Sequence, residues 1–323
     1  MWRSTAKYIT AAGIGGGSSY YYLQNINQEK ASKEDHQNKI KSIVRDQTEI
    51  NLNSYTHLKG IKKWDWNWDH REPTVPTKDG QNCSDSEFID VKAPGKNAVR
   101  NILLIRHGQY DTDGKLDKDR KLTNLGHQQA RYTGDRVAHY YLLAKQRAAE
   151  RWKLKNPDVD INDENDGFTF PKLQLFQSSM MRAQQTSSDI KEVLKEAKID
   201  FEYVGESDLL REGPPYPTEP PLSKWAPEAK YWEESARIEA GFRKFIHRAE
   251  EDQTDESYEV ITCHGNVIRY FICRALQLPP EAWLRISLAH GSITNLSVSP
   301  KGTVSLRSMG DNGYMPVDKC SRR

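Results

Sequence analysis

"LLIRHGQ", residues 103–109, is the stretch of sequence that decides the fold. The apolar run that ends at Ile105 is typical of a strand buried inside a sheet, and Arg106, His107 and Gly108 follow it without a break. Histidine is the side chain whose charge changes near neutral pH. A buried strand that ends on it places a reactive side chain at the edge of the sheet. This stretch therefore predicts a buried strand, Arg100–Arg106, and a reactive site at its end.

Predicted strands and helices alternate along the chain from residue 99 onward. Further strands are expected over 172–179, 258–264, Ser292–Ser297 and Thr303–Arg307. Helical patterns of apolar residues occupy 122–146, 180–197, 227–251 and 265–277. Thr123 is in position to cap the first of these helices. The alternation predicts an α/β domain with a mostly parallel sheet and helices on both faces, which is a three-layer sandwich.

Polar residues follow three of these predicted strands at the point where each strand ends. Arg106 and His107 end the first strand, His264 ends the strand over 258–264, and Arg182 lies in the helix that follows 172–179. Ligands of such sheets bind at the carboxyl ends of the strands, so we expect these side chains to meet there. Two arginines bind a dianion through planar, multi-donor hydrogen bonds, which suits a phosphoryl group.

The expected cluster also suggests how each member would act. Neighbouring cations disfavour an imidazolium, so His107 should stay neutral and act as a nucleophile toward phosphorus. The helix that begins near Gly265 would add backbone N–H groups for the phosphate. Glu212, in "LLREG", is the candidate general acid if burial raises its pKa. Taken singly, each of these residues also has a structural interpretation, and it is their convergence on the strand ends that favours a site.

Composition excludes several classes of function. The chain has 323 residues, 47 of them basic and 45 acidic, so its formal charge of +2 gives no reason to expect a nucleic-acid partner. Its four cysteines contain no CxxC pair, which indicates reduced thiols rather than a disulfide framework or a zinc site. Cys263 and Cys273 are expected to be core residues without a chemical role.

Residues 1–24 form a segment of a different kind. The segment is basic, with Arg3 and Lys7, and the stretch Tyr8–Leu23 is uncharged. As a helix that stretch would span about 24 Å, against a hydrocarbon core of about 30 Å. Three interpretations remain open: a weak single-pass membrane anchor, a mitochondrial targeting segment, or a disordered tail.

Residues 25–98 are predicted to be a polar linker that contains a tryptophan-rich motif, "WDWNWD", at 64–69. In an extended strand, alternation would place one set of side chains, Trp64, Trp66 and Trp68, opposite the other set, Asp65, Asn67 and Asp69. So much aromatic surface needs a partner. Packing on its own domain is one interpretation, and docking on another subunit as an assembly motif is the favoured one.

Five ordered blocks resemble the histidine phosphatase, or phosphoglycerate mutase, superfamily over residues 99–310: "LIRHGQ", "LTNLGHQQA", "SSMMRAQQT", "LLREG" and "CHGNVIRY". The resemblance implies a catalytic domain over 99–323 that needs no metal or cofactor. It implies that His107 is the phosphorylated nucleophile and Glu212 the acid. It also implies that the phosphate is bound by the matching basic residues and the start of the next helix, namely Arg106, Arg182, His264 and Gly265.

The tryptophan motif, "SLAHGSIT" and "GDNGYMP" are similar to the mitochondrial serine/threonine protein phosphatases of that superfamily. This similarity implies phosphoprotein substrates and a location at the inner or outer mitochondrial membrane. It further implies a homo-oligomer in which dimers build larger, more active rings or filaments through the motif. Residues 145–170 depart from the family pattern as an insertion.

Other functions remain open from the sequence. A phosphoglycerate mutase-like enzyme or a small-molecule phosphatase would use the same residues, although Gln109-Tyr110-Asp111 stands where mutases offer Ser and Asn. A non-catalytic mitochondrial scaffold is a third alternative, against which the complete set of site residues argues.

Overall fold

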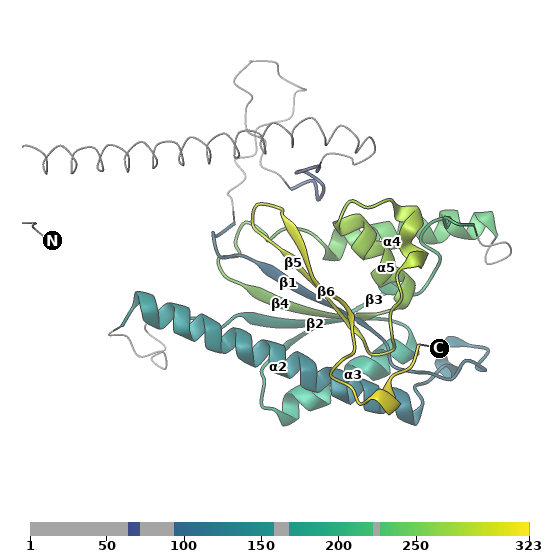
Figure 1. Ribbon diagram of the computed structural model, residues 1–323, viewed down its shortest axis with the longest axis horizontal. Coiled ribbons are helices and arrows are strands. Elements are labelled where there is room, and N and C mark those ends of the chain that lie inside the picture. Colours follow the sequence, from purple (N-terminus) through teal and green to yellow (C-terminus); the bar gives the residue numbers. More distant parts are fainter. Residues whose placement is uncertain (1–63, 72–93, 158–167, 222–226, 323) are drawn as a thin grey trace, which may run out of the picture. The chain divides into compact units, whose positions relative to one another are not determined.

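A six-stranded sheet forms the centre of the computed structural model (Figure 1), which describes residues 64–71, 94–157, 168–221 and 227–322. The strand order is β3-β2-β4-β1-β5-β6. The strands are β1 (Arg100–Arg106), β2 (Lys172–Ser178), β3 (Glu202–Ser207), β4 (Ser257–Cys263), β5 (Ile293–Val298) and β6 (Val304–Asp311). The carboxyl ends of β2, β4 and β1 are therefore neighbours, as the sequence predicted.

The sheet is mixed rather than purely parallel. β3, β2, β4 and β1 run parallel, whereas β5 is antiparallel to β1 and β6 is antiparallel to β5. β5 and β6 are joined by a short turn, and a short connection can only return the chain in the opposite direction. β3 was not foreseen, because it is an exposed edge strand without an apolar run.

Two pairs of helices cover the two faces of the sheet (Figure 1), which confirms the predicted α/β sandwich. The alternating side chains of β1 show why: Leu103 and Ile105 pack toward one pair, and Ile102 and Leu104 toward the other. The first pair is α2 (Asn124–Lys155) and α3 (Met181–Glu196), and the second pair is α4 (Glu228–Phe245) and α5 (Gly265–Ala275).

Helix α2 begins where the sequence predicted and ends later. Thr123 Oγ1 accepts a hydrogen bond from Gly126 N at 3.1 Å, which confirms it as the N-cap. A Cβ atom on Gly126 would lie 1.9 Å from Gln109 O, so only glycine lets the helix approach the loop that leaves β1. The helix continues to Lys155 through the first part of the predicted insertion, of which residues 158–167 lie outside the described residues.

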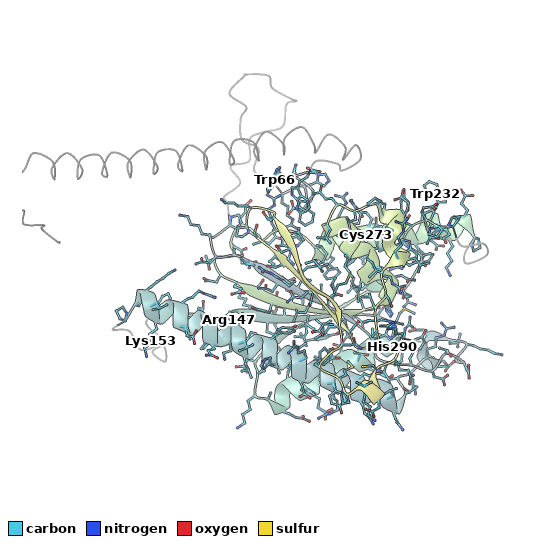
Figure 2. All side chains as sticks on the ribbon, in the orientation of Figure 1. Trp66, Arg147, Lys153, Trp232, Cys273 and His290 are labelled. Atoms are coloured by element: carbon cyan, nitrogen blue, oxygen red, sulfur yellow. The ribbon has the colours of Figure 1, made fainter. Side chains whose placement is uncertain are left out.

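The tryptophan motif is not an extended strand, so the predicted one-sided tryptophan stripe is wrong. Residues 66–69 form a turn. Trp68 is only 6% exposed, packs on Phe242 with ring centroids 6.0 Å apart, and donates from Nε1 to Gly302 O at 2.8 Å. Trp66 is 53% exposed. Figure 2 shows its side chain at the edge of the domain. The motif therefore packs on its own chain, the interpretation that the sequence favoured less.

A buried ion pair explains this turn. Asp69 accepts hydrogen bonds from Arg248 N at 2.8 Å, Nε at 2.9 Å and Nη2 at 2.7 Å, and both side chains are almost fully buried. The pKa of Asp69 is lowered, because the bonds and charge of Arg248 outweigh the burial that would raise it. In the predicted strand Asp69 lies on the side opposite the tryptophans, whereas in the structure its side chain lies in the interior.

Among the described helices, none is both long enough and apolar enough to cross a bilayer. The predicted anchor, residues 1–24, lies outside the described residues.

Candidate active site

The ends of β1 and β4 bring the two predicted histidines together. His107 N donates to Cys263 O at 3.0 Å, which continues the parallel pairing of the strands by one residue. His264 follows Cys263 directly and is the residue before α5. Both imidazoles are buried, and their ring centroids lie 5.1 Å apart.

The hydrogen bonds of His107 fix its tautomer. Nδ1 lies 2.8 Å from Gly108 O, and a carbonyl oxygen only accepts, so Nδ1 carries the proton. Nε2 then has the free electron pair, and it accepts from Arg182 Nε at 3.2 Å. Burial lowers the pKa of His107 well below its usual value, and neighbouring His264 and Arg182 lower it further. His107 is thus a neutral imidazole whose electron pair faces a guanidinium.

His264 is also neutral and has one ring nitrogen to spare. Its Nε2 lies 2.9 Å from Ser178 Oγ, while Nδ1 is buried and has no partner among the described residues. Burial and the charge of Arg182 lower the pKa of His264 well below its usual value. Ser178 Oγ accepts from Met180 N at 3.3 Å and can donate its own proton to Nε2. When Ser178 donates to Nε2, the imidazole proton lies on Nδ1, where it can be donated to a ligand.

Two guanidinium groups border these histidines from different elements. Arg182, in the first turn of α3, is buried and contacts Asp117 through Nη1 at 3.5 Å. Arg106 donates from Nη1 to Leu288 O at 2.6 Å, and its buried Nε has no partner within the described part of the chain. A Cβ atom on Gly265 would lie 3.6 Å from Arg106 Nε, an ordinary contact. The end of the sheet therefore places buried positive charge around His107.

Glu212 lies at the same place, beyond the short helix η4 (Asp208–Leu210) that follows β3. Its Oε1 accepts from Gly213 N at 3.1 Å and its Oε2 from Asn266 N, in the first turn of α5, at 3.4 Å. Burial raises the pKa of Glu212, although Arg182 and these two N–H groups oppose the rise. The sequence predicted this direction for a general acid. The structure thus brings together every residue predicted for the phosphate site.

Comparison with known proteins identifies the family. The model of the histidine phosphatase superfamily (branch 1) matches residues 166–311. The mouse protein named serine/threonine-protein phosphatase PGAM5, mitochondrial, is 44% identical over 267 residues, which cover 80% of each chain. The Xenopus laevis protein of that name is 38% identical over 319 residues and covers 98% of this chain and 99% of its own.

The chain belongs to the histidine phosphatase superfamily. It is accordingly a phosphatase. A Plasmodium falciparum phosphoglycerate mutase of known structure aligns with 68% of this chain and 96% of its own at 26% identity, with a TM-score of 0.40. Arg106 and His107 precede the segment that the superfamily model matches, so their place in the site depends on the geometry described above.

Two residues of this histidine phosphatase site were not predicted. His290 Nε2 accepts from Arg106 Nη2 at 3.1 Å, and its Nδ1 lies 2.9 Å from Ser321 Oγ. Tyr110 packs its ring edge on His107, with centroids 5.0 Å apart, and the Arg182 guanidinium lies 4.7 Å from the centre of the Tyr110 ring. The His-Gly pair at 290–291, just before a predicted strand, was the only signal available in the sequence.

His290 should make the stability of the protein depend on pH. Burial and Arg106 lower its pKa to about 3, whereas an unfolded chain has a histidine pKa of about 6.5. Below pH 6.5 the unfolded state gains a proton that the folded state refuses, so this residue disfavours folding increasingly as pH falls. We expect His290→Asn to reduce the loss of unfolding free energy between pH 7 and pH 5 by about 2 kcal/mol, measured by urea denaturation.

His139→Asn, which replaces a histidine at an exposed position, is the control variant measured beside it. The same slope in His290→Asn and in the parent protein would contradict this assignment.

Proposed function

We propose that the chain is a protein serine/threonine phosphatase that works at mitochondria through a phosphohistidine intermediate and without a metal ion. The observation that carries the mechanism is the neutral His107, with its Nε2 electron pair facing Arg182 Nε at 3.2 Å. The relatives' names support the substrate class and the location, since they are called mitochondrial serine/threonine-protein phosphatases. The basic, acid-free segment before Glu29 is consistent with that location.

In the first step a phosphate ester would bind between Arg182 and His107. Arg182 Nε would then donate its hydrogen bond to the phosphate instead of to His107 Nε2. Arg106 Nε and His264 Nδ1, both buried and without partners in the described residues, supply further donors. Nε2 attacks phosphorus, and the bond to the serine or threonine oxygen breaks. That oxygen receives a proton from Glu212, whose raised pKa keeps it protonated more often than an ordinary carboxyl group.

In the second step the Glu212 carboxylate takes a proton from water, which attacks the phosphohistidine. The bond between phosphorus and Nε2 breaks, inorganic phosphate leaves, and the acid is restored. A hollow of about 560 Å³ lies beside the site, and its lining includes Tyr110, Asp111 and Lys121. Such a hollow offers space for the polypeptide that carries the phosphorylated side chain.

The intermediate can be trapped directly. After brief incubation with a phosphorylated peptide and acid-free quenching, we expect intact-mass measurement to show one added phosphate, labile in acid and stable in alkali. His107→Ala should lose the label and the turnover together, because no other described imidazole has its free electron pair next to Arg182. His139→Ala, at an exposed position, should keep both. A label that persists in His107→Ala would refute the assignment of the nucleophile.

The variant Glu212→Gln tests whether Glu212 protonates the leaving group. An alkoxide leaves only with a proton, so turnover of a phosphoserine peptide should fall by about 10²- to 10⁴-fold. An activated aryl phosphate needs little protonation and should lose less than about tenfold. Steady-state rates on both substrates test this, and equal losses would instead indicate a structural role for Glu212.

We also propose that the tryptophan motif assembles and activates the enzyme by exchange between subunits, at a membrane surface. Trp68 and Asp69 contact Phe242, Arg248 and Gly302, and the motif of a second copy would make the same contacts after an exchange. Residues 72–93 would reach about 70 Å if fully extended, which is enough to span neighbouring subunits.

Sedimentation velocity tests this exchange. Trp68→Ala should shift assembly toward smaller species by about 30-fold or more in association constant, since a buried interface aromatic contributes over about 2 kcal/mol. Trp66→Ala, at a mostly exposed position, should sediment like the parent protein. If Trp68→Ala sediments like the parent protein, the motif serves only its own chain.

A further inference from the structure

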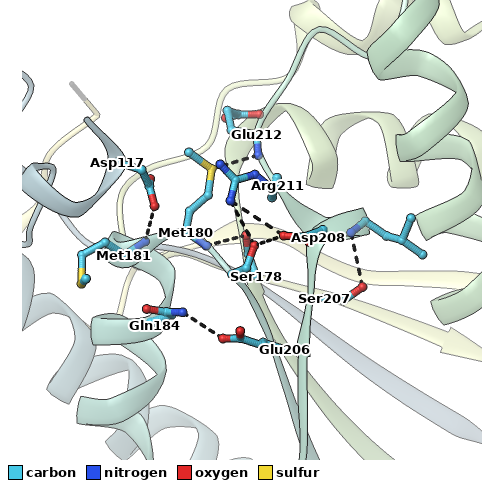
Figure 3. Close-up of polar contacts among 12 residues, drawn as sticks. Asp117, Ser178, Met180, Met181, Gln184, Glu206, Ser207, Asp208, Arg211 and Glu212 are labelled. Carbon is cyan, nitrogen blue, oxygen red and sulfur yellow. Dashed lines mark hydrogen bonds and ion pairs between the residues drawn. The ribbon is translucent and has the colours of Figure 1, made fainter. Parts of the chain in front are cut away.

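The sulfur of Met180 lies between the two groups that handle the phosphate and the leaving group. Its Sδ accepts from Arg182 Nη2 at 3.6 Å. It also accepts from Glu212 N at 3.3 Å, a contact that Figure 3 draws. Met180 is half-buried, so a small molecule that enters the site can reach it. It is the N-cap position of α3, where a thioether supplies no capping bond, and its sulfur instead faces two N–H donors.

We propose that Met180 is a modification site at which a hydroperoxide such as hydrogen peroxide reversibly inactivates the enzyme. The inference rests on the proposed roles of Arg182 and Glu212 in the reaction.

The chemistry is a two-electron oxidation of sulfur. The thioether attacks one peroxide oxygen, the S–O bond forms, and the O–O bond breaks. The other oxygen leaves as hydroxide and takes the remaining proton, so the products are methionine sulfoxide and one water molecule. Sulfur is oxidised and the peroxide is reduced, and methionine sulfoxide reductases reverse the change with a thiol as the electron source.

The neighbours of the sulfur determine the consequence. A thioether sulfur is a weak acceptor, whereas a sulfoxide oxygen is a strong one. The new oxygen would bind Arg182 Nη2, which is then no longer free for phosphate. It would also need space next to Glu212 N, and a shift of that backbone would disturb the hydrogen bond between the Glu212 carboxyl group and Asn266 N. Phosphate binding and protonation of the leaving group would both suffer.

The cysteines near the site are poor competitors for peroxide. Cys263, next to His264, is buried, and that burial raises its pKa far above the usual value, so it remains a thiol. Burial likewise raises the pKa of Cys273 to about 11. Cys320 is exposed and Cys83 lies outside the described residues, so the experiment has to remove their contribution.

The test uses purified full-length enzyme treated with hydrogen peroxide and then with dithiothreitol, which reduces disulfides and cysteine sulfenic acids but not methionine sulfoxide. Turnover of an aryl phosphate and binding of inorganic phosphate are measured on each sample. Peptide mass spectrometry locates the added oxygen. Met180→Leu is compared with Met181→Leu, the adjacent and similarly half-buried methionine, and each variant is referred to its own untreated activity.

We expect the parent enzyme and Met181→Leu to lose about tenfold or more in turnover and in phosphate affinity, as when one charge-assisted hydrogen bond is broken. The loss should follow the oxygen on Met180, and methionine sulfoxide reductases A and B should restore activity. Met180→Leu should keep most of its own activity after the same treatment.

Two results would overturn the inference: an equal loss in Met180→Leu, or full oxidation of Met180 without a change in turnover or phosphate binding. The readouts also separate it from the proposed function. If untreated enzyme hydrolyses aryl phosphate but no phosphoserine peptide, the proposed substrate class is wrong, and the oxidation experiment still tests the role of Met180. If the site binds phosphate without turnover, the phosphate-binding measurement alone tests the role of Met180.

Discussion

The parallel pairing of β1 with β4 is the constraint on which the rest of the site depends. The register places Arg106 opposite Cys263, so the residues that follow, His107 and His264, leave the sheet side by side. One shift of register would turn the side chains of β1 to the other face of the sheet. Because Ile102 and Leu104 are buried on one face and Leu103 and Ile105 on the other, the core itself holds the two histidines in place.

The site has a net positive charge, because Arg106 and Arg182 lie inside the protein and few carboxylates are close to them. Arg106 is held mainly by backbone carbonyl groups, and Asp117 contacts Arg182 only at 3.5 Å. Burial keeps both histidines neutral, the surplus of positive charge lowers their pKa values further, and the same surplus attracts a dianion. The same surplus opposes the rise in the pKa of Glu212, so burial has to exceed it for the carboxyl group to serve as an acid.

The sequence predicted features that depend on local patterns. The apolar run before Arg106 and the Thr123 cap are properties of a few adjacent residues, and the strand ends follow from the general behaviour of α/β sheets. It did not predict contacts between distant residues. Asp69 and Arg248 are 179 residues apart in the sequence, and Arg106 and His290 are 184 residues apart. No local sequence pattern near these residues indicates which partner each one contacts. The alternation in "WDWNWD" was misleading because a buried ion pair overrode it.

The unpaired donors of the site also have a thermodynamic meaning for the whole molecule. Arg106 Nε and His264 Nδ1 are buried without hydrogen bonds among the described residues, and each unmet donor disfavours the folded state. A bound phosphate would satisfy them and would therefore act as a folding ligand, shifting the unfolding equilibrium according to its concentration. The protein thus keeps donors available for the substrate and has a lower free energy of unfolding as a result, as many enzymes do. A chain optimised only to stay folded would replace these donors with apolar groups and lose its chemistry.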